Sequence, residues 1–380
     1  MTLEDIKIQN RKAQHIRISL RDDVTYEERC NHLFSEIRLV HKAFPGLKLS
    51  DVDLKTKFLN YDLEAPIIIE AMTGGVQEAK TINENIAKIA SKFKIAVGLG
   101  SQRPIITSKF NSSILETYRV VRDIASDVPV IGNIGIAQLL ELDLNDIIHA
   151  IEVTGADALA VHLNPAQEVV QPEGDTDFSE KLLDRLSTLL KSMSKPVIVK
   201  EVGHGLSMEV VSLFSKLGIK VFDVAGACGT SWVKVEAQRC PENTFNHQLG
   251  VKLHNEWWGL PTPISIVETR FASRSSLVIA SGGVWDGIKA AKSLALGANM
   301  VGFARPLLKA LLEGGFNSAV KYVENYVSEL RIVMFLVGAQ SVDKLCKTPI
   351  MLGPTIASFL ATRGIDVPLY VKELRCRHEE

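Results

Sequence analysis

Polar or glycine-rich residues stand directly after eight short apolar runs, and these residues are the best suited to chemistry. No pair of a carboxylic acid and a base stands out among them. The chain also has no zinc motif, no P-loop and no GxGxxG sequence that opens a helix. In chain order the segments are Met72-Thr73-Gly74-Gly75, Ser101-Gln102-Arg103, Asn133, His162-Leu163-Asn164, Lys200-Glu201, Ala225-Gly226, Ser281-Gly282-Gly283 and Ala304-Arg305.

The last two segments favour phosphate binding. Gly282 and Gly283 would let a phosphate approach the main chain, and the N–H groups of a following helix would bind it. Ala304 and Arg305 end the next apolar run, which is the second half of the usual phosphate site in a (β/α)8 barrel. The alternative is that these glycines only form tight turns.

Lys200 ends the apolar run PVIVK and needs an anionic partner if its side chain points inward. A reduced flavin, which carries negative charge near N1, or a flavin phosphate would supply one. The alternative is a structural ion pair with a neighbouring carboxylate such as Glu201.

The segment that starts at His162 is polar and acidic as far as Asp175. It places Asn164, Gln167 and Glu168 close together. A carboxylate beside a phosphorylated substrate suits Mg²⁺, which keeps several waters and needs few protein ligands. The simpler alternative is a solvated acidic loop.

Two further segments carry reactive side chains. Arg11 and Lys12 precede the first apolar run and could fold over a barrel mouth to hold a phosphate. An exposed basic pair is the simpler interpretation from the sequence alone. Cys228 follows the sixth run, but no adjacent histidine would activate it as a nucleophile.

The apolar runs alternate with helical patterns, which indicates βαβ units with strands buried on both faces. Eight such units favour a closed (β/α)8 TIM barrel over an open doubly wound sheet. The predicted strands are Ala65–Met72, Lys94–Gly100, Val128–Gly135, Ala156–Leu163, Pro196–Val202, Ile219–Gly226, Ser276–Gly283 and Asn299–Arg305. The predicted helices include Glu78–Phe93, Asp143–Thr154, Ser207–Leu217 and Trp285–Leu296.

The chain divides into two predicted parts. Residues 1–60 form an N-terminal extension, with a helix around Glu27–Ala43, that contributes to substrate binding. Residues 61–380 form the barrel with C-terminal helices, including one over residues 317–337. The active site is expected at the carboxyl ends of the strands.

Composition excludes some partners. The formal net charge is -1, so no overall field draws the protein to nucleic acid or to a membrane. The five cysteines are dispersed, which predicts free thiols in a reducing compartment. The N-terminus has no apolar signal core, and no apolar run approaches the ~20 residues of a membrane span. A cytoplasmic protein is expected.

Several of these segments resemble the FMN-dependent type 2 isopentenyl-diphosphate isomerases. They are RKAQHI, EAMTGG, GLGSQR, HLNPAQEVVQPEGD, VIVKEVGHG, DVAGACGTSW and SGGVWDG with GFARP, in the same order. The resemblance implies interconversion of isopentenyl and dimethylallyl diphosphate in isoprenoid biosynthesis. It also implies reduced FMN, Mg²⁺, NADPH as reductant, and a homotetramer or larger homo-oligomer.

The same resemblance assigns roles to particular residues. Substrate binding falls to Arg11, Lys12, Ser101, Gln102, Arg103, Asn164 and Gln167, catalysis to Gln167, His162 and Lys200, and metal binding to Glu168. FMN would contact Ala71, Met72, Thr73, Ser101, Asn133, Lys200, Ala225, Thr230, Gly282, Gly283, Ala304 and Arg305. Cys228 and Ala225 depart from the expected pattern, which affects flavin contacts only at the margin.

The implied reaction moves a proton onto an unactivated alkene and removes another, through a cation-like intermediate. The lack of an acid and base pair favours reduced FMN as the acid and base, acting through N5, with Lys200 stabilising charge near N1. Three alternatives remain open. They are an FMN oxidoreductase of a small hydroxy acid, a nucleotide dehydrogenase with Cys228 as nucleophile, and a non-catalytic flavin-binding protein.

Overall fold

Eight parallel strands close into a barrel in the computed structural model, which describes residues 3–377. The strands run in chain order around the barrel, and the last one pairs with the first. This confirms the predicted (β/α)8 barrel over an open sheet. The strands are β4 (Ile67–Ile69), β5 (Ala96–Gly98), β6 (Val130–Gly135), β7 (Ala158–Leu163), β8 (Val197–Glu201), β9 (Val221–Asp223), β10 (Leu277–Ala280) and β11 (Met300–Phe303).

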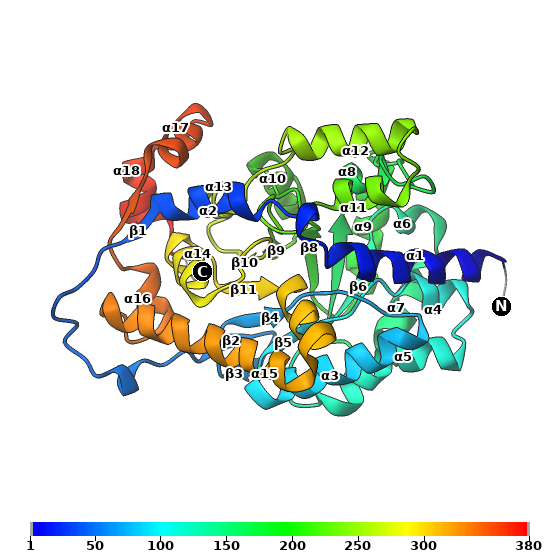
Figure 1. Cartoon of the computed structure of the whole chain (residues 1–380), viewed down its shortest axis with the longest axis horizontal. Coiled ribbons are helices and arrows are strands. Elements are labelled where there is room, and N and C mark those ends of the chain that lie inside the picture. Colours follow the sequence, from blue (N-terminus) through cyan, green and yellow to red (C-terminus); the bar gives the residue numbers. More distant parts are fainter. Residues whose placement is uncertain (1–2, 378–380) are drawn as a thin grey trace.

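Helices cover the outside of the barrel (Figure 1). Each buries one apolar face, as α3 does with Ile82, Ile86 and Ala90. The outer helices include α3 (Gln77–Phe93), α5 (Ser112–Ile124), α7 (Leu144–Val153), α9 (Lys181–Ser192), α10 (Met208–Lys216), α13 (Thr262–Ala272), α14 (Gly287–Leu296) and α15 (Arg305–Leu336). The four helices predicted between strands lie within two residues of α3, α7, α10 and α14.

Shorter helices interrupt the connections on the carboxyl side of the strands. The connection after β5 holds α4 (Arg103–Thr107), and α6 (Gln138–Glu141) follows β6. The loop after β7 contains α8 (Pro165–Glu168), and the long segment after β9 folds into α11 (Trp232–Arg239) and α12 (Phe245–Asn255). These additions build a rim around the barrel mouth.

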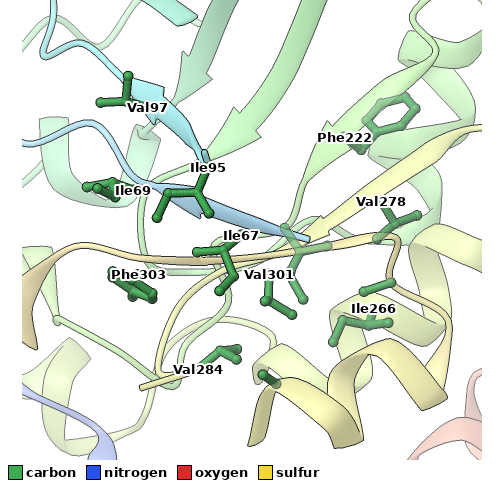
Figure 2. Close-up of a cluster of buried hydrophobic side chains, with 14 of the residues drawn as sticks. Ile67, Ile69, Ile95, Val97, Phe222, Ile266, Val278, Val284, Val301 and Phe303 are labelled. Atoms are coloured by element: carbon green, nitrogen blue, oxygen red, sulfur yellow. The ribbon is translucent and has the colours of Figure 1, made fainter. Parts of the chain in front are cut away.

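Two apolar cores hold the barrel together. One lies between strands and helices, where Figure 2 shows Ile67, Ile69, Val301 and Phe303 gathered in a single cluster. The other fills the barrel interior. There, Phe58 and Leu63 from the hairpin of β2 (Thr56–Phe58) and β3 (Tyr61–Leu63) pack with interior strand residues such as Ile68, Ile131 and Ile198. The hairpin therefore closes the end of the barrel opposite the candidate site.

The N-terminal segment wraps over the barrel. In Figure 1, α1 (Leu3–Ser19) runs beside α11, which it contacts. The predicted helix at 27–43 is too long: α2 spans Glu27–Glu36, and β1 (Ile37–Leu39) then pairs with β12 (Ile350–Leu352) near the C-terminus. Helical periodicity continues into β1, so the pattern alone did not mark that boundary. The division at residue 60 stays a prediction, and residues 1–2 and 378–380 lie outside the described residues.

The C-terminal helices complete the covering. The helix predicted at 317–337 is the second half of α15, which starts at Arg305 and has one non-helical residue, Gly315, with φ of 75°. After it come α16 (Val342–Cys346), α17 (Pro354–Thr362) and α18 (Val367–Leu369). Across the described part of the chain, every helix is too short or too polar to cross a membrane.

Four of the five cysteines form disulfides, so the prediction of free thiols is wrong for them. Cys30 on α2 is joined to Cys228 in the loop after β9, and Cys346 to Cys376. Only Cys240 is free. A separation of 198 residues between Cys30 and Cys228 leaves no spacing signal in the sequence. Their proximity arises because α2 packs against that loop.

Removing the Cys30–Cys228 bridge should lower stability. The double variant C30S/C228S is expected to lose about 2–4 kcal/mol of unfolding free energy, because the long loop closed by the bridge becomes unrestrained in the unfolded chain. Denaturant unfolding of the variant and of the unreduced protein measures this. C240S, which alters the free buried thiol, is the control and should change stability less. Equal stability of C30S/C228S and the unreduced protein would contradict the pairing.

Candidate active site at the carboxyl ends of the strands

A cavity of about 270 Å³ opens at the carboxyl ends of the barrel strands. Strand register brings its polar residues together, since His162 pairs with Lys200 and Lys200 pairs with Asp223. All but one of the predicted site residues line it. They are Arg11, Lys12, Ala71, Met72, Thr73, Ser101, Arg103, Asn133, His162, Asn164, Gln167, Glu168, Lys200, Ala225, Thr230, Gly282, Gly283, Ala304 and Arg305.

Gln102 is the exception, and the expectation of a substrate contact there needs correction. Its side chain is 1% exposed and does not line the cavity. The amide Nε2 donates to the Thr154 hydroxyl at 2.8 Å, and Oε1 accepts from the Asn133 N–H at 3.1 Å. Gln102 instead ties β6 to α7. Neighbouring residues at a loop start point in different directions, and the sequence did not show which one turns inward.

Glycines form one wall of the cavity. A Cβ on Gly283 would lie 2.1 Å from the Cys228 carbonyl oxygen, and one on Gly282 would lie 2.2 Å from that of Gly226. Both have positive φ, +80° and +86°. Within residues 3–377, neither glycine N–H donates to an acceptor of the chain. Two free N–H groups in a loop that tolerates no side chain fit the phosphate of FMN.

The Arg305 side chain does not point to the glycine wall, where a contact with the FMN phosphate was expected. Its guanidinium donates to the Ser19 carbonyl at 2.7 Å and to Asp22 at 2.7 Å, and it lies over the Trp285 ring. The side chain therefore fastens the end of α1 to the barrel. Any contact of Arg305 with a phosphate would come from the backbone at the start of α15.

Lys200 lies at the floor of the cavity, facing inward. Its Nζ is 3.1 Å from Asp223 Oδ2 and 3.8 Å from Glu70 Oε2, and it donates to the Glu201 carbonyl at 2.8 Å. Although burial opposes it, Asp223 helps to hold the pKa of Lys200 above its ordinary value. The alternative partner, the Glu201 carboxylate, accepts instead from the N–H groups of Val202 and Gly203. Lys200 is thus a cation paired beneath the cavity.

His162 is held as a neutral ring. Its Nδ1 lies 2.6 Å from Asn133 Oδ1, so the ring N–H at that position donates to the amide oxygen. Burial, with the charge of Lys200, lowers the pKa of His162 to about 3. The remaining nitrogen, Nε2, is then a hydrogen-bond acceptor.

Arg11 and Lys12 on α1 reach the mouth of the cavity. Lys12 Nζ donates to the Gly74 carbonyl and lies 3.0 Å from the Tyr118 hydroxyl. Burial, with the charge of Arg11, lowers the pKa of Lys12 to about 7. Arg11 lies 3.8 Å from Glu173. Arg11 and Lys12 therefore form part of the mouth and are not an exposed basic pair. The Glu173 carboxylate offsets only part of their positive charge.

A buried carboxylate that the sequence did not single out organises one side of the mouth. Glu236 on α11 is fully buried and accepts from Gln167 Nε2 at 2.8 Å. It also lies 2.8 Å from His15 Nε2 and pairs with Arg239. Although burial opposes it, the bonds and charges of these partners lower the pKa of Glu236 to about 2. No motif marks this glutamate, because two of its partners, His15 and Gln167, come from segments distant in the sequence.

Glu168 is the candidate metal ligand. Its carboxylate accepts from Asn164 Nδ2 at 2.7 Å and from the Asp175 N–H at 2.8 Å, and it is 9% exposed. Burial raises its pKa, against the effect of those bonds. Among the residues whose side chains the structure describes, no group of three or more His, Cys, Asp or Glu could hold a metal alone. A single carboxylate fits Mg²⁺ only where phosphate oxygens and waters complete the shell.

Cys228 does not act as a free nucleophile here, because its sulfur is bonded to Cys30 and the residue is 1% exposed. The nucleotide dehydrogenase reading, which needs a thiolate at this position, is therefore wrong. The small loop around Cys228 serves to pack against Gly283.

Comparison with known proteins gives consistent results. Residues 168–352 match the family of FMN-dependent dehydrogenases. The fold is similar to that of a mandelate oxidase variant, with a TM-score of 0.59 and 15% identity over 90% of this chain and 92% of the other. A flavocytochrome b2 variant also gives 0.59, at 19% identity over 94% and 85% of the two chains. At such identities the likeness concerns the fold alone.

Closer relatives cover almost the whole chain. The isopentenyl-diphosphate delta-isomerase of Sulfurisphaera tokodaii is 41% identical over 369 residues, 97% of this chain and 98% of the relative. That of Ignicoccus hospitalis is 40% identical over 97% and 99%, and that of Thermococcus onnurineus 38% identical over 96% of each. With the family motifs gathered around one cavity, the chain belongs to the FMN-dependent type 2 isopentenyl-diphosphate delta-isomerase family.

Proposed function

We propose that this cavity holds reduced FMN and an allylic or homoallylic diphosphate together, and so interconverts isopentenyl diphosphate and dimethylallyl diphosphate for isoprenoid biosynthesis. The proposal rests on two anion sites at one cavity. The glycine wall at Gly282 and Gly283 offers free N–H groups, while Arg11 and Lys12 reach the mouth from α1. Two phosphorylated molecules would then meet above Lys200.

FMN would contact the glycine wall through its phosphate, and its ring would lie among Met72, Thr73, Asn133 and Lys200. When bound and reduced, FMN would supply the acid and the base of the proton shift. The chain would supply orientation, exclusion of water and fixed charges. Lys200 places a cation on the floor of the cavity. This cation would stabilise negative charge on the reduced FMN ring.

Two side chains fix hydrogen-bonding directions inside the cavity. Glu236 holds the Gln167 amide with Nε2 toward itself, and Asn164 Nδ2 lies 3.4 Å from Gln167 Oε1. These two contacts fix which way the Gln167 amide points and which of its ends is the donor and which the acceptor. His162 presents Nε2 as an acceptor, because its Nδ1–H donates to Asn133 Oδ1. We propose that both orient the substrate without giving up a proton.

Further parts of the proposal concern the diphosphate and the setting of the enzyme. Glu168 would bind one Mg²⁺ whose other ligands are diphosphate oxygens and water. NADPH would reduce FMN, and the enzyme would work in the cytoplasm as a homotetramer or a larger homo-oligomer.

The reaction is tested by product identification. The protein is loaded with FMN, reduced without oxygen, and given isopentenyl diphosphate and Mg²⁺ in deuterated water. Dimethylallyl diphosphate with deuterium in its methyl group is expected by NMR. A small 2-hydroxy acid is added in a parallel sample of oxidised protein. Bleaching of the flavin by the hydroxy acid, with no isomerised diphosphate in the first sample, would support the oxidoreductase instead.

Lys12 should take up a proton when the diphosphate binds. With a pKa of about 7 the amine is partly neutral at neutral pH, and a nearby anion raises that pKa. Uptake should be near zero well below pH 6, about half a proton at pH 7 and larger at pH 8. Calorimetry in buffers of different ionisation enthalpy measures it, as the difference between the wild type and K12M. The exposed variant K55M is the control, and equal uptake in K12M and wild type would refute the assignment.

A further inference from the structure

The floor of the cavity contains one cation facing two carboxyl groups. Lys200 comes from β8, Asp223 from the end of β9, and Glu70 directly follows β4. Lys200 Nζ is 3.1 Å from Asp223 and 3.8 Å from Glu70. The three residues are 8%, 2% and 7% exposed in that order. A single lysine cannot neutralise two buried carboxylates. One of the two carboxyl groups is therefore expected to be protonated.

The chain stabilises an anion on Asp223. Its Oδ1 accepts from the Ser281 hydroxyl at 2.5 Å and from the Ala225 N–H at 3.3 Å, and its Oδ2 faces the lysine. Hydrogen bonds of this kind favour the ionised form of a carboxyl group. Asp223 is therefore the counter-ion of Lys200.

Glu70 lacks equivalent support. Its Oε1 is buried and has no hydrogen-bond partner in the described part of the chain, and its Oε2 is beyond hydrogen-bond distance of Lys200. Burial and the neighbouring Asp223 raise the pKa of Glu70 well above its ordinary value, against the lowering effect of Lys200. Burying an unpartnered ionised oxygen at this depth costs far more free energy than burying a neutral carboxylic acid there.

Glu70 Oε1 packs closely against β11. A Cβ on Gly302 of β11 would lie 2.3 Å from Glu70 Oε1. A void of about 10 Å³ beneath the floor touches Glu70, Lys200 and Asp223. That volume is at the lower limit for one water molecule. Glu70 also lines the main cavity, but its Oε1 is buried and has no partner among the described residues.

Other titratable groups near the floor are already engaged. The His162 ring is neutral, the Glu201 carboxylate accepts from backbone N–H groups, and the Arg305 guanidinium bonds to the end of α1. They leave the charge balance of the floor to Lys200, Asp223 and Glu70.

We propose that Glu70 is a positioning residue that stays a neutral carboxylic acid beside the Lys200–Asp223 ion pair, so that the floor carries one cation and one anion. The inference rests on the proposed function, in which reduced FMN lies above Lys200. An ionised Glu70 would leave the floor with a net negative charge against the negative charge of the reduced ring. A neutral Glu70 holds the lysine in place without opposing that charge.

The midpoint potential of bound FMN tests this with E70Q, D223N and E64Q, each as the holoprotein at pH 7. E70Q keeps the shape of a neutral acid, so its midpoint potential should equal that of wild type. The ratio of its affinities for reduced and oxidised FMN should change by less than twofold. D223N removes a true buried anion and should raise the potential by a tenfold change or more in that ratio, ~30 mV for two electrons. E64Q alters an exposed glutamate and should have no effect. A rise in E70Q equal to that in D223N would overturn the proposal.

Infrared spectroscopy reads the proton directly and needs no turnover. The flavin bands cancel in the wild type minus E70Q difference spectrum. That spectrum should contain the C=O stretch of a protonated carboxyl group, and the stretch should shift in D₂O. The wild type minus E64Q spectrum should not contain it. Glu70→Met, which is uncharged and similar in volume, gives the same reading if E70Q does not fold. Absence of the band would overturn the proposal, whereas the band without isomerase activity would count against the proposed function alone.

Discussion

Gly283→Ala is expected to give a folded barrel that retains almost no FMN. The new Cβ would meet the Cys228 carbonyl oxygen at 2.1 Å, and the residue would keep a φ of +80°. The backbone on both sides would have to separate, and the N–H groups would turn away from the phosphate. Strain of about 1–3 kcal/mol together with the lost phosphate contacts should weaken FMN binding by ~100-fold or more. Flavin fluorescence titration of the apoprotein measures this.

Gly218→Ala is the matched control for that variant. Gly218 also has a positive φ, +94°, but a Cβ there meets nothing within 4 Å. Both variants therefore carry backbone strain, and only Gly283→Ala pushes the two cavity loops apart. If both lost FMN to the same extent, general destabilisation and not the glycine wall would explain the effect. If Gly283→Ala bound FMN as wild type does, the phosphate is not held there.

Glu236→Gln is expected to lower kcat by ~100-fold or more, with a smaller change in KM, since well-oriented polar groups contribute on this scale. The amide that replaces the carboxylate removes the charge that orders His15 and Arg239, and its single acceptor oxygen cannot serve both Gln167 and Arg239. Gln167 would then turn away from its present orientation. Steady-state kinetics with isopentenyl diphosphate, on protein fully loaded with reduced FMN, measures the change.

Glu173→Gln separates the orientation of Gln167 from the ion pair with Arg239. Glu173 also binds Arg239, but its side chain is 43% exposed and does not contact Gln167. The variant should keep most of wild-type kcat. Equal losses in both variants would mean that Arg239, and not the Gln167 contact, controls the rate. Denaturant unfolding of each checks that lost stability is not the cause, because breaking a buried ion pair is destabilising.

The barrel and most of its cavity were predictable because both depend on local patterns. Continuous apolar runs mark strands buried on both faces, and the closed barrel brings every carboxyl end to one mouth. Polar residues such as Asn133 and Lys200, which follow these runs directly, were therefore placed correctly in the cavity. Gln102 shows the limit, since one position of difference turns a side chain from the cavity to the space behind it.

The remaining residues were unpredictable because their roles depend on contacts between distant segments. Glu236 contacts side chains on α1 and α8, and Cys30 is bonded to a cysteine 198 residues away. Arg305 was expected at a phosphate, yet the end of α1 takes its guanidinium. Glu70 lies in a predicted strand end as one charged residue among apolar ones. Its meaning appears only when Asp223 and Lys200 are placed around it.

In the proposed reaction a bound, reduced flavin handles the protons while the polypeptide positions it. An anaerobic titration distinguishes this role of the flavin from catalysis by the polypeptide alone. FMN-loaded protein is reduced stepwise, and the isomerisation rate is followed beside the fraction of flavin reduced. We expect a rate proportional to reduced FMN, product in large molar excess over the electrons supplied, and no activity in the apoprotein. Full activity without flavin, or product limited to one molecule per electron pair, would contradict it.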